Sequence, residues 1–250
     1  MALLTKGRYQ ARLATTSGDI ERALALRDLR FRAGQGAAPK DQSDRDHFDS
    51  RCLHVLVEDM QSGDLVCCYR LIAMNSGAEI DTSYSAQFYD LSRLAGFAGK
   101  MLELGRFCTQ RDRQDADILR VAWGALTRLV DQTGVEMLFG CSSFEGARPE
   151  PHAAALTLLA RTHLAPQHWR PKEKAAQVFR FAEDLSLNNV DLRLGLKTMP
   201  PLLRTYMAMG GWVSDHAVID HELDTLHVFA GVEIANIPPA RVRLLRAVAG

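Results

Sequence analysis

The sequence predicts an α/β protein built on a mixed, mostly antiparallel sheet that is flanked by helices. Two observations support this fold class: β-rich runs alternate with runs whose apolar residues recur at helical spacing, and two neighbouring β-rich runs are joined by a tight turn. The chain has 250 residues, 47% of them hydrophobic, which is enough for a substantial core. Because no segment has the composition of a linker, we expect a single domain over residues 1–250, with a C-terminal extension of roughly residues 165–250 packed on it.

The first elements are a strand, a helix and a β-hairpin. Residues 9–15 alternate weakly, as in a strand, and residues 17–19 then supply capping oxygens for a helix with apolar residues at helical spacing. Residues 53–59 and 65–74 are β-rich runs separated by Ser-Gly-Asp at 62–64, which predicts an antiparallel hairpin.

The rest of the chain repeats this alternation. A helical stripe follows a charged loop, and Asp115 or Asp117 can cap that helix. The expected strands are 101–109, 135–143, 212–219 and 226–234, and the expected helices are 118–130, 153–164 and 200–209.

Composition excludes several classes of protein. Thirty basic residues balance thirty acidic ones, so the net charge gives no reason to expect a nucleic-acid partner. The five cysteines form no CxxC pair and most lie in apolar runs, which is typical of reduced core cysteines. No window has the length and hydropathy of a signal peptide or a membrane span, so we expect a cytoplasmic protein.

Two opposite charges lie close together on the predicted strand 101–109. Period-two alternation places Glu103 and Gly105 on one face of the strand and Leu104 and Arg106 on the other. Buried charges are costly unless they are paired, so the structural explanation is a salt bridge across the sheet, with Arg70 of the hairpin as a candidate partner. The functional explanation is a catalytic carboxylate, and the residues alone favour the structural one.

A charged loop precedes the strand 53–59. Asp44, Asp46 and Asp49 gather three carboxylates beside His47, a composition that suits a cationic amine or a metal, with a solvated acidic loop as the alternative. The eight histidines are scattered and no second ligand cluster accompanies the loop, so we expect no metal.

These charged residues, taken in order, resemble the signature of the acyl-homoserine-lactone synthase branch of the GNAT acyltransferase superfamily and the related ornithine acyl carrier protein N-acyltransferases. The residues that carry this resemblance are Arg27-x-x-x-Phe31, Asp46-x-x-Asp49, Arg70 and Glu103-x-x-Arg106. The stretches 138–144 and 200–206, followed by Gly210 and Gly211, extend the likeness to ornithine-lipid-forming N-acyltransferases over nearly the whole chain. Lactone synthases usually carry a Trp where Gly34-Gln35-Gly36 stands here.

The resemblance implies a GNAT-like fold and a specific reaction. A 3-hydroxyacyl group would move from an acyl carrier protein to the α-amine of L-ornithine and form lyso-ornithine lipid. In the wider superfamily a glycine-rich loop grips coenzyme A, but the corresponding residues 109–115 contain no glycine. We therefore expect no resident cofactor, with acyl carrier protein and its 4′-phosphopantetheine as the donor. The candidates for the basic surface that binds it are Arg111, Arg113, Arg120, Arg148, Lys172 and Lys174.

The hypothetical roles follow from the chemistry of acyl transfer to an amine. Glu103 would remove the proton from the substrate ammonium, because only the neutral amine is a nucleophile. Arg70 and Arg106 would hold Glu103 and the substrate carboxylate. The remaining candidates bind substrate: Asp46 and Asp49 would accept its side-chain ammonium, Arg27 and Phe31 would shape the pocket, and Ser142 or Ser143 would meet the 3-hydroxyl.

Several alternatives stay open at this point. The chain could be a lactone synthase that uses S-adenosylmethionine, or a noncatalytic module that binds acyl chains or carrier proteins, and glutamine or lysine could replace ornithine. A lipid product also suggests peripheral contact with the inner membrane. Residues 241–246 could form a short basic amphipathic element for that contact, although ordinary packing of a terminal helix is the favoured explanation.

Overall fold

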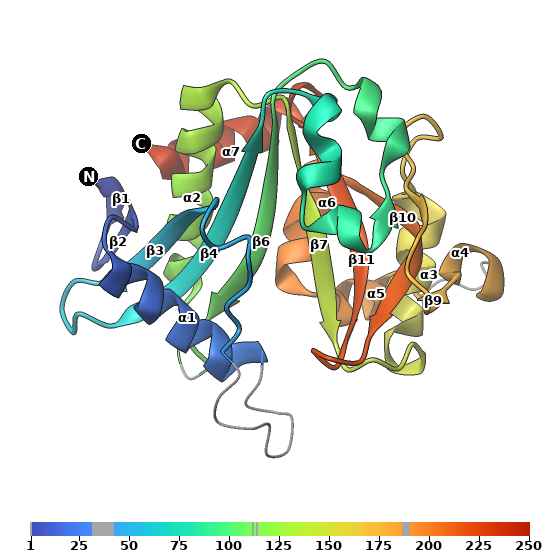
Figure 1. The fold of residues 1–250 in the computed structure, drawn as a ribbon, viewed down its shortest axis with the longest axis horizontal. Coiled ribbons are helices and arrows are strands. Elements are labelled where there is room, and N and C mark those ends of the chain that lie inside the picture. The colour runs from blue at the N-terminus through green and yellow to red at the C-terminus, as the bar shows by residue number, and fades with distance from the viewer. Residues whose placement is uncertain (1, 32–42, 112, 114, 187–190) are drawn as a thin grey trace. The chain divides into compact units, whose positions relative to one another are not determined.

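The computed structural model describes residues 2–31, 43–111, 113, 115–186 and 191–250. Its chain forms two compact units (Figure 1). Unit 1 comprises Met1–Ala73, Leu104–Val135 and Pro239–Gly250, and unit 2 comprises Met74–Glu103 and Glu136–Pro238. The prediction of one domain over residues 1–250 stays a prediction. Gly34-Gln35-Gly36 lies outside the described residues.

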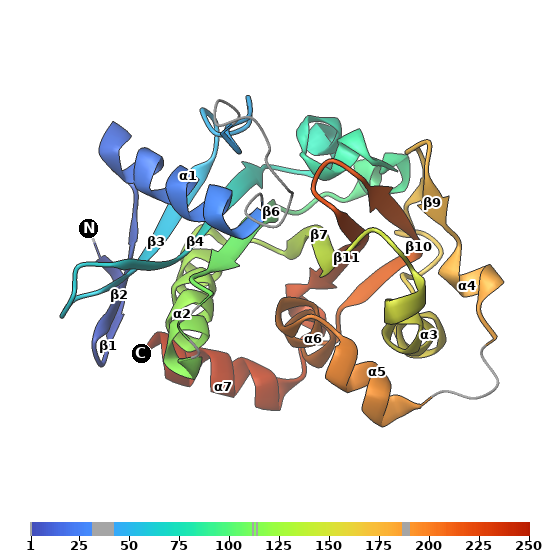
Figure 2. The same cartoon turned by 90° about the horizontal axis from the view of Figure 1, so that it is seen from below.

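Unit 1 is a sheet with helices on both faces. Its strands follow the order β1, β2, β3, β4 and β6, and the first four pair antiparallel in succession. Figure 2 shows α1 on one face of this sheet and α2 on the other. The elements are β1 (Ala2–Lys6), β2 (Tyr9–Leu13), α1 (Ser17–Phe31), β3 (Leu53–Asp59), β4 (Leu65–Met74), residues 104–109 of β6 (Met101–Thr109), α2 (Ala116–Thr133) and α7 (Pro239–Ala249).

The local sequence explains these elements. The predicted hairpin is confirmed, because β3 and β4 pair antiparallel and Gly63 takes the left-handed φ of +75° that their turn requires. Asp115 caps α2 by accepting a hydrogen bond from the Asp117 N–H, and Gly134 ends the helix in the left-handed conformation.

The C-terminal helix α7 packs against α2. A Cβ at Gly124 of α2 would lie 3.0 Å from the Val248 side chain, so glycine at this position allows the two helices to approach closely. The Arg246 guanidinium pairs with Asp131 of α2 at 3.1 Å. These contacts are those of a packed terminal helix, and the suggested membrane contact of residues 241–246 stays a prediction.

Unit 2 contains the second group of strands, in the order β6, β7, β11, β10 and β9. Residues 101–103 of β6 pair parallel with β7, whereas the other neighbours pair antiparallel. The strands are β5 (Tyr89–Asp90), β7 (Met137–Glu145), β8 (Lys172–Glu173), β9 (Val178–Phe179), β10 (Trp212–Asp220) and β11 (Thr225–Glu233). The helices are α3 (Ala153–Thr162), α4 (Phe181–Asp184), α5 (Leu192–Thr198) and α6 (Pro201–Ala208). The 3₁₀ turns are η1 (Gly77–Thr82), η2 (Ser85–Gln87), η3 (Ser92–Gly96), η4 (Glu150–His152) and η5 (Ile234–Asn236).

Two different layers cover the strands of unit 2. Figure 2 shows the turns η1 to η3 on one side of β7, β11 and β10, and the helices α3, α5 and α6 on the other. On the first side the Tyr89 hydroxyl donates to the backbone carbonyl of His227 at 2.9 Å, which attaches this segment to β11. Among the described residues, no helix has the length and hydropathy needed to cross a membrane.

Candidate functional site

Six charged side chains of unit 1 form one network, here called the arginine–aspartate cluster. Its members are Arg27, Asp44, Asp46, Asp49, Arg70 and Arg106. They come from α1, from the loop before β3, from β4 and from β6. Three guanidinium groups face three carboxylates, so the formal charges of the cluster cancel.

Arg27 is deeply buried, with 1% of its side chain exposed. Its Nε donates to Asp44 Oδ2 at 2.6 Å, and its Nη1 donates to Asp49 Oδ1 at 2.6 Å. The guanidinium also donates to the backbone carbonyl of Asp44 at 2.7 Å. Arg27 therefore fixes the charged loop against α1, and the structure gives it an anchoring function where the sequence suggested that it shapes a pocket.

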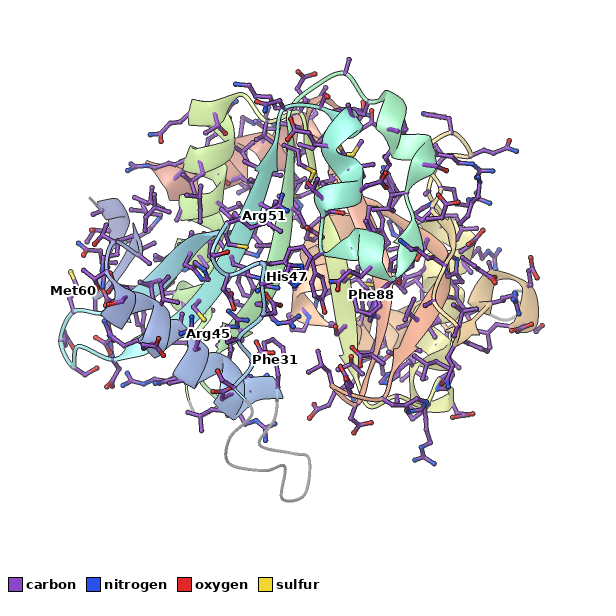
Figure 3. All side chains as sticks on the ribbon, viewed as in Figure 1. Phe31, Arg45, His47, Arg51, Met60 and Phe88 are labelled. Carbon is purple, nitrogen blue, oxygen red and sulfur yellow. The ribbon has the colours of Figure 1, made fainter. Side chains whose placement is uncertain are left out.

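Arg70 on β4 binds two carboxylates of the same loop. It grips Asp46 with both terminal nitrogens, at 2.6 and 2.7 Å, and its Nη1 donates to Asp49 Oδ1 at 2.8 Å. The guanidinium also lies over the Phe48 ring, 5.7 Å from the centroid. In Figure 3 the labelled residues Arg45, His47 and Arg51 mark the loop that Arg70 holds.

Arg106 departs from the predicted alternation of its strand. Its φ of +49° is left-handed, which is costly for a residue other than glycine. Its Nε donates to Asp44 at 3.0 Å, and its Nη2 lies 3.6 Å from Asp46 Oδ2. A Cβ at Gly105 would also face this cluster, 3.8 Å from Arg70 Nε. The prediction that Gly105 and Arg106 point to opposite faces is thus wrong, because the left-handed backbone turns the arginine toward the loop.

The cluster controls the ionisation of its carboxylates. Burial alone would raise the pKa of Asp49, but hydrogen bonds from Arg27, the Asp46 N–H and Arg70 outweigh it and hold that pKa well below its usual value. Burial would also raise the pKa of Asp46, but the hydrogen bonds and the charge of Arg70 outweigh burial and lower that pKa. Burial lowers the pKa of His54, whose Nε2 lies 3.0 Å from the Asp49 carbonyl oxygen. Asp46 and Asp49 therefore stay charged at neutral pH. Asp46 is the most accessible carboxylate of the cluster, with 23% of its side chain exposed.

Glu103 lies in unit 2 and its carboxylate accepts hydrogen bonds from Tyr84 and Ser85. The Tyr84 N–H donates to Oε2 at 2.8 Å, and Ser85 donates to Oε1 through its N–H at 2.7 Å and its Oγ at 2.5 Å. Only 2% of the residue is exposed. Donors of this kind favour the charged carboxylate.

Two further groups of unit 2 belong to the surroundings of Glu103. The Cys141 thiol lies 3.4 Å from Ser85 Oγ, next to the hydroxyl that Glu103 binds. Burial and then the charge of Glu103 raise the pKa of Tyr206, so this tyrosine keeps its proton. Ser85 and Tyr206 had no predicted role. The 3₁₀ turn that carries Ser85 has no periodic pattern in the sequence that would have indicated one.

The two serine candidates on β7 differ in exposure. Ser142 is buried, and Ser143 is exposed and pairs with His227 of β11. Since adjacent residues of a strand point to opposite faces, only one of the two can contact a given acyl chain.

The basic candidates for binding a carrier protein are partly engaged inside their own units. In unit 1, Arg113 pairs with Asp59 at 2.8 Å and with Asp64 at 2.6 Å, and Arg120 pairs with Asp117. In unit 2, Lys172 lies 3.6 Å from Asp90 and Lys174 donates to the Ala86 carbonyl at 2.6 Å. Arg111 and Arg148 are both exposed. Arg111 and Arg148 are therefore the candidates with the most freedom to meet a partner.

The carboxylates of the arginine–aspartate cluster are directed at guanidinium groups. Among the residues that the structure describes, no group of three or more His, Cys, Asp or Glu side chains is arranged to hold a metal ion.

Comparisons with known proteins agree with this fold. The family described as an acetyltransferase (GNAT) domain matches residues 26–124. An L-ornithine N(alpha)-acyltransferase of Brucella abortus is 30% identical over 245 residues, which covers 92% of this chain and 86% of that protein. The enzyme of the same name from Rhodobacter capsulatus is 30% identical over 230 residues, covering 88% of each chain.

Solved structures share the architecture at low identity. An N-acyl amino acid synthase from uncultured soil microbes has a TM-score of 0.52 and 9% identity, covering 92% of this chain and 94% of that one. A CoA-dependent acyl-homoserine lactone synthase has a TM-score of 0.50 and 12% identity, covering 96% and 95%. The predicted GNAT-like fold is thereby confirmed.

Proposed function

The chain belongs to the L-ornithine N(alpha)-acyltransferase family, and on that premise we propose that it moves an acyl group onto the α-amine of L-ornithine. The acyl group is a 3-hydroxyacyl chain carried by acyl carrier protein, and the product is lyso-ornithine lipid. The observation that carries this proposal is the Glu103 carboxylate, which is buried and held by Tyr84 and Ser85 in a GNAT-like fold. A buried acceptor of this kind is what acyl transfer to an ammonium group requires.

Glu103 acts as the general base of the reaction. It takes a proton from the α-ammonium, directly or through a water, and the free amine attacks the thioester carbonyl carbon. A carbon–nitrogen bond forms, the carbon–sulfur bond breaks, and the phosphopantetheine thiolate leaves. The second proton lost by the attacking nitrogen is the one that protonates this thiolate. Tyr84 and Ser85 hold the carboxylate in position while it accepts the proton.

The arginine–aspartate cluster recognises the charged ends of ornithine. Asp46 is its most accessible carboxylate, so Asp46 binds the side-chain ammonium. Arg106, whose side chain is 13% exposed, binds the substrate carboxylate, while the buried Arg70 holds Asp46 in place, a change from the role that the sequence suggested for Arg70. Asp49 is committed to Arg27 and Arg70 and is only 3% exposed at its side chain. We therefore assign Asp49 and Arg27 to positioning the loop, which changes the role that the sequence suggested for them.

The donor is acyl carrier protein, and no resident cofactor takes part. Residues 109–115 between β6 and α2 contain no glycine, which disfavours close backbone contact with the pyrophosphate of coenzyme A. Acyl carrier proteins are acidic, and Arg111 and Arg148 offer cations that are available to such a partner.

The test measures thiol release from 3-hydroxyacyl carrier protein by the purified protein. Ornithine, S-adenosylmethionine, glutamine and lysine are compared as acceptors, and the products are identified by mass spectrometry. We expect N-acyl-ornithine from the wild type, none from Glu103→Gln, and normal amounts from Glu145→Gln, a matched change at an exposed position of β7. Release with S-adenosylmethionine alone would indicate a lactone synthase, and no release with any amine would indicate a binding module. Either result overturns the proposal.

A further inference from the structure

The short helix α5 of unit 2 exposes an unusual amount of apolar surface. Leu192, Leu194 and Leu196 are 55%, 45% and 48% exposed. Single exposed leucines are ordinary on protein surfaces, but Leu192 and Leu196 are four residues apart and share one face of this seven-residue helix, where they form an apolar patch. Figure 2 shows α5 beside α3 and α6, on the side away from the strands.

The packing of α5 on α3 forces these leucines outward. Gly195 is the buried contact, and a Cβ there would lie 2.9 Å from the Ala154 carbonyl oxygen and 3.0 Å from the Leu158 side chain. The first turn is fixed by Asp191, whose Oδ1 accepts a hydrogen bond from the Leu194 N–H at 2.9 Å. Because α5 packs on α3 through Gly195, the leucines on its other faces are left exposed to solvent.

The charges around the patch are mainly positive. Between residues 191 and 204 the sequence carries three cations, Arg193, Lys197 and Arg204, and a single carboxylate, that of the capping residue Asp191. All three cations are exposed, and Arg204 donates to the Leu196 carbonyl at 3.3 Å, at the end of the helix. Among the described residues, Arg193 and Lys197 have no ion-pair partner.

We propose that α5 and the start of α6 bind the surface of an anionic lipid bilayer. Leucines interspersed with Lys and Arg are the composition that lies in the interfacial layer of a membrane, where cations meet lipid phosphates and apolar side chains enter the acyl boundary. A helix of seven residues is roughly 10 Å long, too short to supply the ~800 Å² per partner of a stable protein interface. The inference goes beyond the proposed function, because it does not depend on which amine is acylated.

Cosedimentation of the full chain with lipid vesicles tests this proposal. One set of vesicles is pure phosphatidylcholine and the other contains about a third phosphatidylglycerol. We expect binding to the anionic set only, weakened by salt. Because each cation near an anionic surface contributes about 1 kcal/mol, Arg193→Gln with Lys197→Gln should weaken binding roughly 30-fold. Leu192→Ser with Leu196→Ser should weaken it at least about tenfold.

The matched control is the helix α7 of unit 1, which the sequence suggested as a membrane element. Leu244→Ser with Arg246→Gln removes an exposed leucine and an exposed cation there, and binding should stay unchanged. Unchanged thermal unfolding and unchanged turnover with soluble substrates would show that the α5 variants are folded, and would separate this inference from the proposed function.

Three outcomes would overturn the inference. The wild type does not bind anionic vesicles, or the α5 variants bind as the wild type does. The third is that size-exclusion chromatography shows a dimer that Leu192→Ser with Leu196→Ser converts to a monomer while vesicle binding persists. That result would identify a second copy of the chain as the partner of α5.

Discussion

Replacing Asp49 by Asn tests whether the arginine–aspartate cluster is a closed network of charges. The substitution keeps the shape of the side chain and removes one of three negative charges that balance three guanidinium groups. Asp49 accepts hydrogen bonds from Arg27 at 2.6 Å, from Arg70 at 2.8 Å and from the Asp46 N–H at 3.0 Å, and its side chain is 3% exposed. The amide cannot replace the charge, so an excess of buried positive charge is left behind.

The expected loss of unfolding free energy is about 3–5 kcal/mol, the usual cost of breaking a buried ion pair by removing one partner. In a chain of this size that corresponds to a melting temperature lower by roughly 10 °C. The matched control is Asp131→Asn, which breaks an exposed pair with Arg246 in the same unit and should cost less than about 1 kcal/mol.

The difference between Asp49→Asn and wild type should also depend on pH. The pKa of Asp49 is lower in the folded than in the unfolded chain, so its contribution is complete above the ordinary carboxyl pKa of about 3.9 and is lost as the pH falls below it. Urea unfolding at neutral pH and at several values below about pH 4 measures both effects. A loss no larger than that of Asp131→Asn, or a loss that is independent of pH, would refute the reasoning.

Three further predictions concern separate parts of the chain. Ser85→Ala removes the hydroxyl donor to Glu103, so kcat should fall about 10- to 100-fold and the acid limb of the pH–rate profile should move to higher pH. An unshifted pH–rate profile would show that Ser85 does not position the Glu103 carboxylate. Gly195→Ala brings a Cβ within 2.9 Å of the Ala154 carbonyl oxygen and should cost about 1–3 kcal/mol in thermal unfolding, whereas Gly96→Ala meets nothing within 4 Å and should be neutral. Alkylation of the native protein should modify the two half-buried thiols and spare the three buried ones, and peptide mass spectrometry identifies the modified residues. Burial raises the pKa of Cys67, and a hydrogen bond with Cys108 together with burial raises the pKa of Cys68, which further lowers the reactivity of these two thiols. The reactive pair is Cys52 and Cys141, and the protected set is Cys67, Cys68 and Cys108.

The fold could be predicted wherever local patterns and burial agree. The bounds of β3, β4 and β6 match the predicted runs, because each run is rich in strand-forming residues and is bordered by turn-forming or charged segments. The helix α2 was indicated by its apolar stripe and its Asp115 cap. The strand β1 and the 3₁₀ turns before β6 were not predicted, since short edge strands and 3₁₀ turns leave little periodicity.

Site residues could be chosen from the sequence, but their partners could not. Arg27, Asp46, Asp49, Arg70 and Arg106 were all singled out, and the structure brings them together in unit 1. Which carboxylate meets which arginine depends on the path of the loop and on the left-handed backbone at Arg106, neither of which has a local signal. The catalytic and substrate-binding roles stay predictions.

The balance of charges in the arginine–aspartate cluster has a consequence for how this protein can change over generations. Losing any one of the six groups leaves the buried cluster with one unbalanced charge, so a lineage that substitutes them singly passes through a less stable ancestor. Removing a facing pair together avoids that intermediate, because no lone charge is left in the interior. In relatives of this chain we therefore expect an arginine and its aspartate to be kept together or replaced together, and a variant library built from paired substitutions should contain more folded members than one built from single substitutions.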